Sequence, residues 1–187
     1  MATRLPSKLR ASSATFQQQQ TSDYPTDKDK WIQIERKRWA KYFNIPISAD
    51  GPKPFPQPTV NTGRALCAVS TLFPAKLPSA FDALYQAFWV EGKTINQADV
   101  ISSALATKFP EGEVKQVMEK IAAPEVKKLL ASNTEKALGE GAFGLPWFVA
   151  TNAEGQTEAF WGVDHLGQVV EHLGLDRKQE PGMRALL

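Results

Sequence analysis

The segment from Gly141 to Val149 places the tightest constraint on what this 187-residue chain can fold into. Pro146 opens an apolar stretch there. Because proline has no N–H to donate to a neighbouring strand, it belongs at a strand start, often after a cis peptide bond. Turn residues follow at Asn152–Gly155, and a second apolar stretch leads into Phe160-Trp161-Gly162-Val163-Asp164. This pattern predicts a strand, a turn, a second strand, and then a helix over about Asp164–His172.

Residues 59–141 are predicted to be almost entirely helical, because apolar side chains recur there at helical spacing. The clearest stripe has the spacing i, i+3, i+4, i+7, i+8 and consists of Phe81, Leu84, Tyr85, Phe88 and Trp89. Asn96 with Asp99 resembles a helix-starting cap. Such stripes usually fill a core, and the tryptophans at 31, 39, 89, 147 and 161 are expected to do the same rather than to line a substrate site.

The chain before this helical region has two further parts. A helix is predicted from Asp27 to about Pro46, and the four prolines of Asp50–Pro58 make an extended linker. The first residues are basic, rich in serine and poor in acids, and include the run Gln17–Gln20. This composition fits a disordered tail or a transit-like segment. The predicted organisation is a tail at 1–26, a helical domain at 27–141 and a C-terminal unit at 142–187.

Composition argues against several classes of function. The formal net charge of +2 gives no general case for nucleic-acid binding. The single cysteine, Cys67, excludes an intramolecular disulfide and a Cys-x-x-Cys pair, and it is expected to be a small buried side chain. His165 and His172 are too few to predict a metal site. No apolar run approaches the roughly 20 residues that span a bilayer, so no membrane passage is expected.

Three segments together resemble the kappa class of glutathione transferases. They are Lys120–Lys128, Gly141–Pro146 and Phe160–Asp164, and the likeness runs from about Lys28 to the C-terminus. That class is similar to the DsbA-like oxidoreductases and the hydroxychromene-carboxylate isomerases. The resemblance implies an α/β, mostly helical chain with a partial thioredoxin-like fold and a DsbA-like all-helical insertion. It also implies a homodimer.

The resemblance further implies a glutathione site. The backbone of Leu145, before the cis-proline Pro146, would pair with the cysteinyl part of glutathione as an added strand does. Val163 and Asp164 would lie at the start of the last helix, where free N–H groups and the helix dipole favour the γ-glutamyl carboxylate. The Asp164 carboxylate would face the γ-glutamyl ammonium. Two purely structural interpretations stay open: that Asp164 only caps the helix, and that Pro146 only shapes the turn before the strand.

The chain departs from the kappa pattern in its N-terminal part. It contains no Ser-Pro-Tyr motif, whose serine the resemblance assigns to stabilising the glutathione thiolate. Ser12, Ser13 and Ser22 have no comparable context. The residues before Lys28 are too few and too polar for a strand, a helix and a strand, so a lone hairpin with an open inner edge is expected. Three explanations stay open: the chain is a shortened relative, its start is not the biological one, or a partner chain supplies the missing strands.

The leading functional hypothesis is a kappa-type glutathione S-transferase that conjugates glutathione with small electrophiles. A non-catalytic glutathione-binding relative is the second, and an isomerase of the same superfamily is the third. A dithiol oxidoreductase is the least favoured, since Cys67 has no second cysteine to pair with. No metal is expected, and the catalytic residues stay unassigned. A mitochondrial or cytoplasmic location is favoured over a peroxisomal one, because the C-terminal Ala185-Leu186-Leu187 is not a Ser-Lys-Leu signal.

Overall fold

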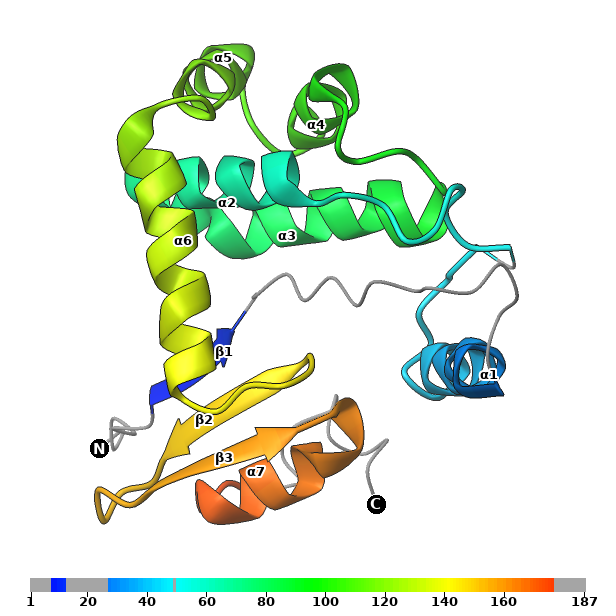
Figure 1. Cartoon of the computed structure of the whole chain (residues 1–187), viewed down its shortest axis with the longest axis vertical. Helices are drawn as coiled ribbons and strands as arrows, with labels where there is room; N and C mark the ends of the chain where they lie inside the picture. The colour runs from blue at the N-terminus through cyan, green and yellow to red at the C-terminus, as the bar shows by residue number, and fades with distance from the viewer. Residues whose placement is uncertain (1–7, 13–26, 49, 177–187) are drawn as a thin grey trace. The chain divides into compact units, whose positions relative to one another are not determined.

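The computed structural model describes residues 8–12, 27–48 and 50–176 of the chain (Figure 1). Within these residues it forms two compact units, one over residues 19–132 and one that combines residues 1–18 with 133–187. We call them the helical unit and the sheet unit. In chain order the helices and strands are β1 (Lys8–Ser12), α1 (Asp27–Tyr42), α2 (Val60–Leu72), η1 (Pro74–Lys76), α3 (Leu77–Tyr85), η2 (Gln86–Val90), α4 (Ala98–Leu105), α5 (Glu111–Lys120), α6 (Pro124–Gly139), β2 (Trp147–Thr151), β3 (Thr157–Trp161), η3 (Val163–His165) and α7 (Leu166–His172).

The sheet unit is built on a three-stranded antiparallel sheet with the strand order β1-β2-β3. The predicted hairpin is β2–β3, in which Trp147 lies opposite Trp161. The expectation of a lone hairpin is wrong, because β1 pairs along the other edge of β2 and places Ser12 opposite Trp147. For the same reason residues 8–12 are a strand and not part of an irregular tail. The rest of the predicted tail lies outside the described residues.

The two faces of β2 contact different helices, as the alternation of side chains along a strand requires. Phe148 and Ala150 pack with Val169 and Leu173 of α7. On the opposite face, Trp147 packs with Ala137 of α6 and with Ala142. This second contact explains why the division between the units falls inside α6, at residue 133, rather than at the predicted boundary after residue 141. The sheet is therefore covered on both faces within its own unit.

The helical unit has a separate core formed by α2, α3, η2, α4, α5 and the beginning of α6. Its completely buried side chains include Val69, Ile101, Leu105 and Val117. Cys67 of α2 is buried in the same core, as predicted.

Two local predictions for the helical unit are wrong. The stripe from Phe81 to Trp89 is not one continuous α-helix, because the α-helical turns of α3 give way to the π-helical turn η2. Tyr85, the last residue of α3, is 55% exposed, whereas Leu84 is buried. Asn96 does not cap α4, because the N-cap of that helix is Gln97. The side-chain oxygen of Asn96 instead accepts a hydrogen bond from the backbone N–H of Asn61, 3.4 Å away.

Arg36 of α1 contacts residues outside its own helix. The guanidinium of Arg36 lies 5.1 Å from the ring centre of Trp89, a cation–π distance. Gly51 lies directly against the same guanidinium, and a Cβ there would be 3.0 Å from its nitrogens.

Nothing among the described helices combines the length and apolar composition needed to cross a bilayer.

Candidate functional site

The predicted site residues come together at one end of the β2–β3 hairpin. Pro146 directly precedes β2, and Gly162 directly follows β3. The N–H of Gly162 donates to the carbonyl oxygen of Pro146 at 3.0 Å, which closes this end of the hairpin. The peptide bond between Leu145 and Pro146 is cis. The two short segments 145–146 and 163–164 are therefore neighbours within the sheet unit.

Leu145 presents its backbone for pairing. It precedes the first residue of the β2 ladder, and neither its N–H nor its carbonyl has a backbone partner among the described residues. Its side chain is 43% exposed. A backbone donor and acceptor without partners at the end of a strand can accept an added extended peptide.

Gly162 sets the direction of the second segment. Its φ of 94° and ψ of 151° belong to a region that only glycine occupies readily. The chain then turns into η3, in which the His165 N–H donates to the Gly162 carbonyl at 3.3 Å. The N–H groups of Val163 and Asp164 are left without a backbone acceptor among the described residues. Unpaired N–H groups at the start of a helical turn are of the kind that can donate to a carboxylate.

Asp164 is not the cap of the last helix. The N-cap of η3 is Gly162 and that of α7 is His165, and neither makes a capping bond through a side chain. The Asp164 side chain is 61% exposed, and its Oδ1 lies 3.3 Å from Nδ1 of His165. It also folds over the Cα of Gly162, where a Cβ would collide with the carboxylate. The α-helix begins at Leu166, later than the predicted start at Asp164.

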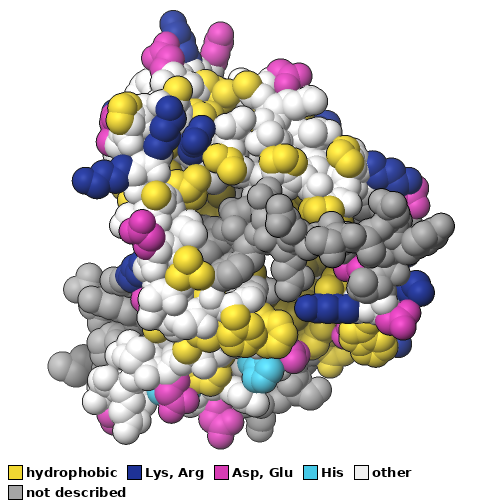
Figure 2. Space-filling view, in the orientation of Figure 1, with side chains coloured by type: hydrophobic (Ala, Val, Ile, Leu, Met, Phe, Trp, Pro, Cys, Tyr) yellow, Lys and Arg dark blue, Asp and Glu magenta, His cyan; other side chains and the backbone are white. Residues whose placement is uncertain are grey.

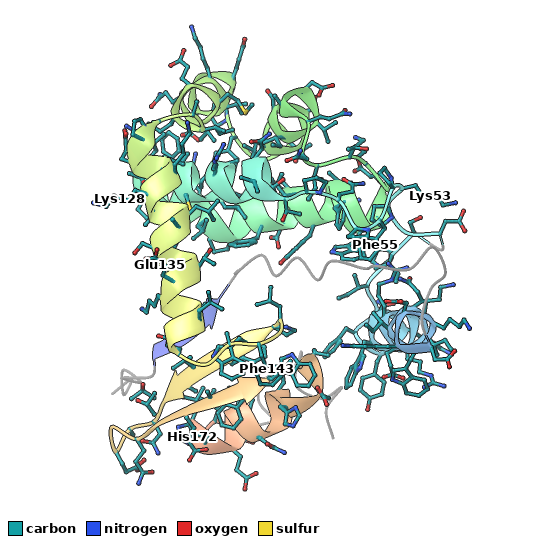
Figure 3. All side chains as sticks on the ribbon, viewed as in Figure 1. Lys53, Phe55, Lys128, Glu135, Phe143 and His172 are labelled. Carbon is teal, nitrogen blue, oxygen red and sulfur yellow. The ribbon has the colours of Figure 1, made fainter. Side chains whose placement is uncertain are left out.

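An aromatic group borders these segments and was not predicted from the sequence. The rings of Phe143 and Trp161 have centroids 4.9 Å apart, and those of Phe143 and Trp147 are 5.5 Å apart. Phe143 is 61% exposed and Trp161 48%, so the expectation that Trp161 fills the core is wrong. Figure 3 shows Phe143 on the loop that leads into β2, and Figure 2 shows hydrophobic side chains gathered on the surface at the same place.

Gly144 explains how the Trp161 ring comes to lie there. A Cβ on Gly144 would be 2.5 Å from Nε1 and 3.1 Å from Cε2 of Trp161, so the indole rests directly on the Gly144 backbone. Glycine is needed at this position for close approach. The signal in the sequence was the glycine between Phe143 and Leu145, but nothing in the sequence alone pairs it with Trp161.

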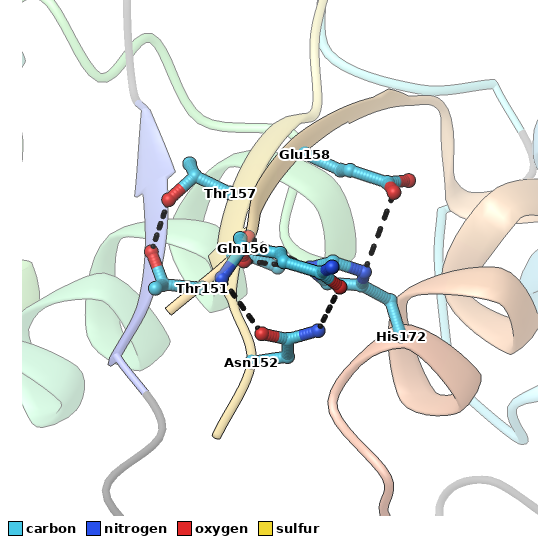
Figure 4. Close-up of polar contacts among 7 residues, drawn as sticks. Thr151, Asn152, Gln156, Thr157, Glu158 and His172 are labelled. Atoms are coloured by element: carbon cyan, nitrogen blue, oxygen red, sulfur yellow. Dashed lines mark hydrogen bonds and ion pairs between the residues drawn. The ribbon is translucent and has the colours of Figure 1, made fainter. Parts of the chain in front are cut away.

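The opposite end of the hairpin is held by a polar cluster (Figure 4). Nε2 of His172, on α7, lies 3.1 Å from the carbonyl oxygen of Ala150 and 3.2 Å from that of Gln156. Its Nδ1 is 3.7 Å from the carboxylate of Glu158. The Asn152 side chain accepts from the Gln156 N–H at 2.8 Å and closes the turn. This cluster joins α7 to the strands and is structural.

Chemically, the site end of the hairpin offers the Leu145 backbone, the N–H groups of Val163 and Asp164, all without backbone partners among the described residues, and one exposed carboxylate. These groups suit a ligand that is part peptide and carries both an anionic and a cationic group. Across the described residues, no three His, Cys, Asp or Glu side chains gather closely enough to hold a metal ion.

Comparisons with curated proteins agree with the resemblance to the kappa class. The chain is 36% identical to human "Glutathione S-transferase kappa 1" over 112 residues, which is 59% of this chain and 49% of that protein. It is 28% identical to Caenorhabditis elegans "Glutathione s-transferase kappa 2" over 78% of this chain and 66% of that protein. The rat kappa 1 protein is 29% identical over 79% of this chain and 66% of its own length. The chain thus spans about half of the human relative's length and slightly under two thirds of the other two.

The fold itself is shared with a solved bacterial structure. A Nitrosomonas europaea protein described as a candidate protein disulfide isomerase superposes with a TM-score of 0.57 at 19% identity, over 80% of this chain and 76% of that one. A family model of the DSBA-like thioredoxin domain matches residues 6–174. These findings confirm the predicted thioredoxin-like fold with its helical insertion, and the chain belongs to the DSBA-like thioredoxin domain family.

Proposed function

We propose that this protein binds glutathione at the site end of the β2–β3 hairpin and acts as a glutathione S-transferase of the kappa type. One observation supports the proposal most strongly. The Gly162 N–H bonds to the Pro146 carbonyl, so the backbone of Leu145 is a close neighbour of the N–H groups of Val163 and Asp164, and none of these groups has a backbone partner among the described residues. The similarity to kappa-class transferases is independent support.

The cysteinyl and γ-glutamyl parts of glutathione each have a partner at this site. The backbone of Leu145 pairs with the cysteinyl residue through main-chain hydrogen bonds, which require no particular side chain. The N–H groups of Val163 and Asp164 donate to the γ-glutamyl carboxylate. The Asp164 carboxylate accepts from the γ-glutamyl ammonium, and a charge-assisted bond of this kind is stronger than a neutral one. Pro146 fixes the direction in which the Leu145 backbone leaves the sheet.

The reaction is a nucleophilic substitution by the glutathione thiolate. A carbon–sulfur bond forms at the electrophilic carbon, the leaving group departs with its electron pair, and the thiol proton passes to water. The thiolate is the reactive form, so a group that lowers the thiol pKa would raise the rate. The chain has no Ser-Pro-Tyr motif to supply that group.

A second candidate function is a glutathione-binding protein without transferase activity. The two candidates share the binding site and differ only in turnover.

We also propose, from the kappa resemblance alone, that the protein is a homodimer. Sedimentation velocity at micromolar concentration tests this, and a monomer throughout the concentration range would contradict it.

The test of the site is calorimetric titration with reduced glutathione. Asp164→Asn removes the charge but keeps the shape of the side chain, and we expect it to weaken binding about 10-fold, the effect of ~1.4 kcal/mol. The matched control is Glu154→Gln, because Glu154 is an exposed acid in the turn at the other end of the same hairpin. Equal loss in both variants would show a general charge effect and would contradict the site.

Turnover is measured separately with 1-chloro-2,4-dinitrobenzene. Conjugation that depends on Asp164 identifies the transferase. Tight glutathione binding without conjugation identifies the non-catalytic candidate instead, and a well-folded protein that does neither contradicts both.

A further inference from the structure

Two large aromatic side chains are exposed side by side on the sheet unit. Phe143 and Trp161 expose 61% and 48% of their surface, and their ring centroids are 4.9 Å apart with an interplanar angle of 56°. Exposed aromatic rings in direct contact cost free energy in water unless a ligand or partner covers them. We call Phe143 and Trp161 the aromatic pair.

The aromatic pair is held in a defined position. Phe143 also packs edge-on against the buried Trp147, with an interplanar angle of 70°. The indole of Trp161 rests on the backbone of Gly144, where there is no room for a side chain. A surface fixed in this way loses little conformational entropy when a ligand binds to it, which favours affinity.

The aromatic pair borders both segments of the proposed glutathione site. Gly144, which supports the Trp161 ring, is directly bonded to Leu145, and Trp161 is directly bonded to Gly162. A cysteinyl residue paired with Leu145 is therefore next to the surface that Trp161 and Phe143 form. The second substrate must approach the sulfur of that cysteinyl residue.

We propose that the aromatic pair binds the electrophilic co-substrate, and that it selects flat aromatic electrophiles over aliphatic ones. The proposal rests on the proposed function, because the location of the electrophile follows from that of glutathione. Offset or edge-to-face contacts between aromatic rings supply the preference, since an alkyl group of similar size lacks the matching quadrupole. Phe143 and Trp161 are thus specificity-determining residues.

The experiment compares two glutathione derivatives that need no turnover. S-methylglutathione has a methyl group on the sulfur, and S-(2,4-dinitrophenyl)glutathione has an aromatic ring. Their dissociation constants are measured by calorimetry with the wild-type protein and with Trp161→Leu, Phe143→Leu and Gly144→Ala. Trp31→Leu is the matched control, because Trp31 is 55% exposed on α1 and belongs to the helical unit.

We expect the aromatic derivative to bind wild type about 10-fold more tightly than the methyl derivative, which corresponds to ~1.4 kcal/mol. Trp161→Leu and Phe143→Leu are expected to reduce this ratio to about 2-fold while the affinity for S-methylglutathione stays unchanged. Gly144→Ala keeps both rings but displaces the indole, so it is expected to reduce the ratio as well. Trp31→Leu leaves the ratio as in wild type.

Several results would overturn the proposal. If both derivatives bind wild type equally, or if the ratio survives Trp161→Leu, the aromatic pair does not bind the electrophile, and the glutathione site stands without it. If neither derivative binds, the proposed function itself fails. If Trp161→Leu dissociates a wild-type dimer in sedimentation velocity and leaves the ratio intact, the aromatic pair is an interface between copies. Circular dichroism confirms that each variant is folded.

Discussion

Gly162 and Gly155 lie at opposite ends of the β2–β3 hairpin and both have positive φ, 94° and 81°. Their surroundings differ. A Cβ at Gly155 meets nothing within 4 Å, whereas a Cβ at Gly162 collides with the Asp164 carboxylate. Substituting alanine at each of the two glycines therefore distinguishes the effect of backbone strain from the effect of displacing Asp164.

We expect both Gly155→Ala and Gly162→Ala to lower the free energy of unfolding, by about 1–3 kcal/mol, because alanine is strained at positive φ. Only Gly162→Ala is expected to weaken glutathione binding as well, since it displaces Asp164. Urea unfolding and calorimetric titration measure the two effects. Unchanged glutathione affinity in Gly162→Ala would contradict the position assigned to the Asp164 carboxylate.

At the residue scale, the sequence was informative about the backbone and not about exposure. The placement of Pro146 before a strand follows from its missing N–H, and the structure confirms it. Trp161 was expected in the core because alternation along a strand does not tell which face or end is covered. The contact of Trp161 with Gly144 joins residues from two different segments, and such a contact cannot be read from one sequence.

At the scale of elements, His172 is the main polar link between α7 and the hairpin. Phenylalanine at this position keeps the contact with Phe160, whose ring centroid is 5.8 Å away, but removes the ring nitrogen that faces the carbonyls of Ala150 and Gln156. We expect His172→Phe to lower the free energy of unfolding by about 1–2 kcal/mol. Amide hydrogen exchange should show faster opening of α7.

The control for this variant is Gln168→Ala, because Gln168 is exposed on the same helix. Its exchange rates should match those of the wild type. Equal acceleration in the two variants would mean that α7 opens for reasons unrelated to His172.

The elements themselves were predictable where the periodicity is long. The helix predicted from Asp27 to about Pro46 begins at Asp27 and ends at Tyr42. The strand at Lys8–Ser12 is not predicted from the sequence, because five residues inside a basic, serine-rich segment are too short a pattern, and only pairing with β2 identifies it. The side chain of Asn96 was misread because bonding to Asn61, 35 positions earlier, competes with local capping.

At the scale of the whole molecule, the proposed site and the larger core belong to different units. Leu145, Pro146, Val163 and Asp164 all lie in the sheet unit, whereas Leu105 is completely buried in the helical unit. We expect Leu105→Ala to lower the free energy of unfolding by about 2–5 kcal/mol, through the cavity it creates, with no change in glutathione affinity below the unfolding transition. Urea unfolding and titration at low temperature check this. Affinity that falls in step with stability would contradict a site confined to the sheet unit.

Whole-molecule organisation was only partly accessible from sequence. The contrast between a helical region and a strand-rich end predicted two parts, but α6 continues without a break from one unit into the other. Because a continuous helix gives no boundary signal, the contact of Ala137 with Trp147 is needed to place the division.

The most direct test of the central claim is a titration of isotope-labelled protein with reduced glutathione, followed by amide chemical shifts. We predict that the amides of Leu145, Val163 and Asp164 shift together, with one dissociation constant, and that Asp164→Asn raises this constant about 10-fold at all three amides. Shifts confined to other segments, or shifts at Leu145 that are independent of those at Val163 and Asp164, would contradict a single glutathione site at this end of the hairpin.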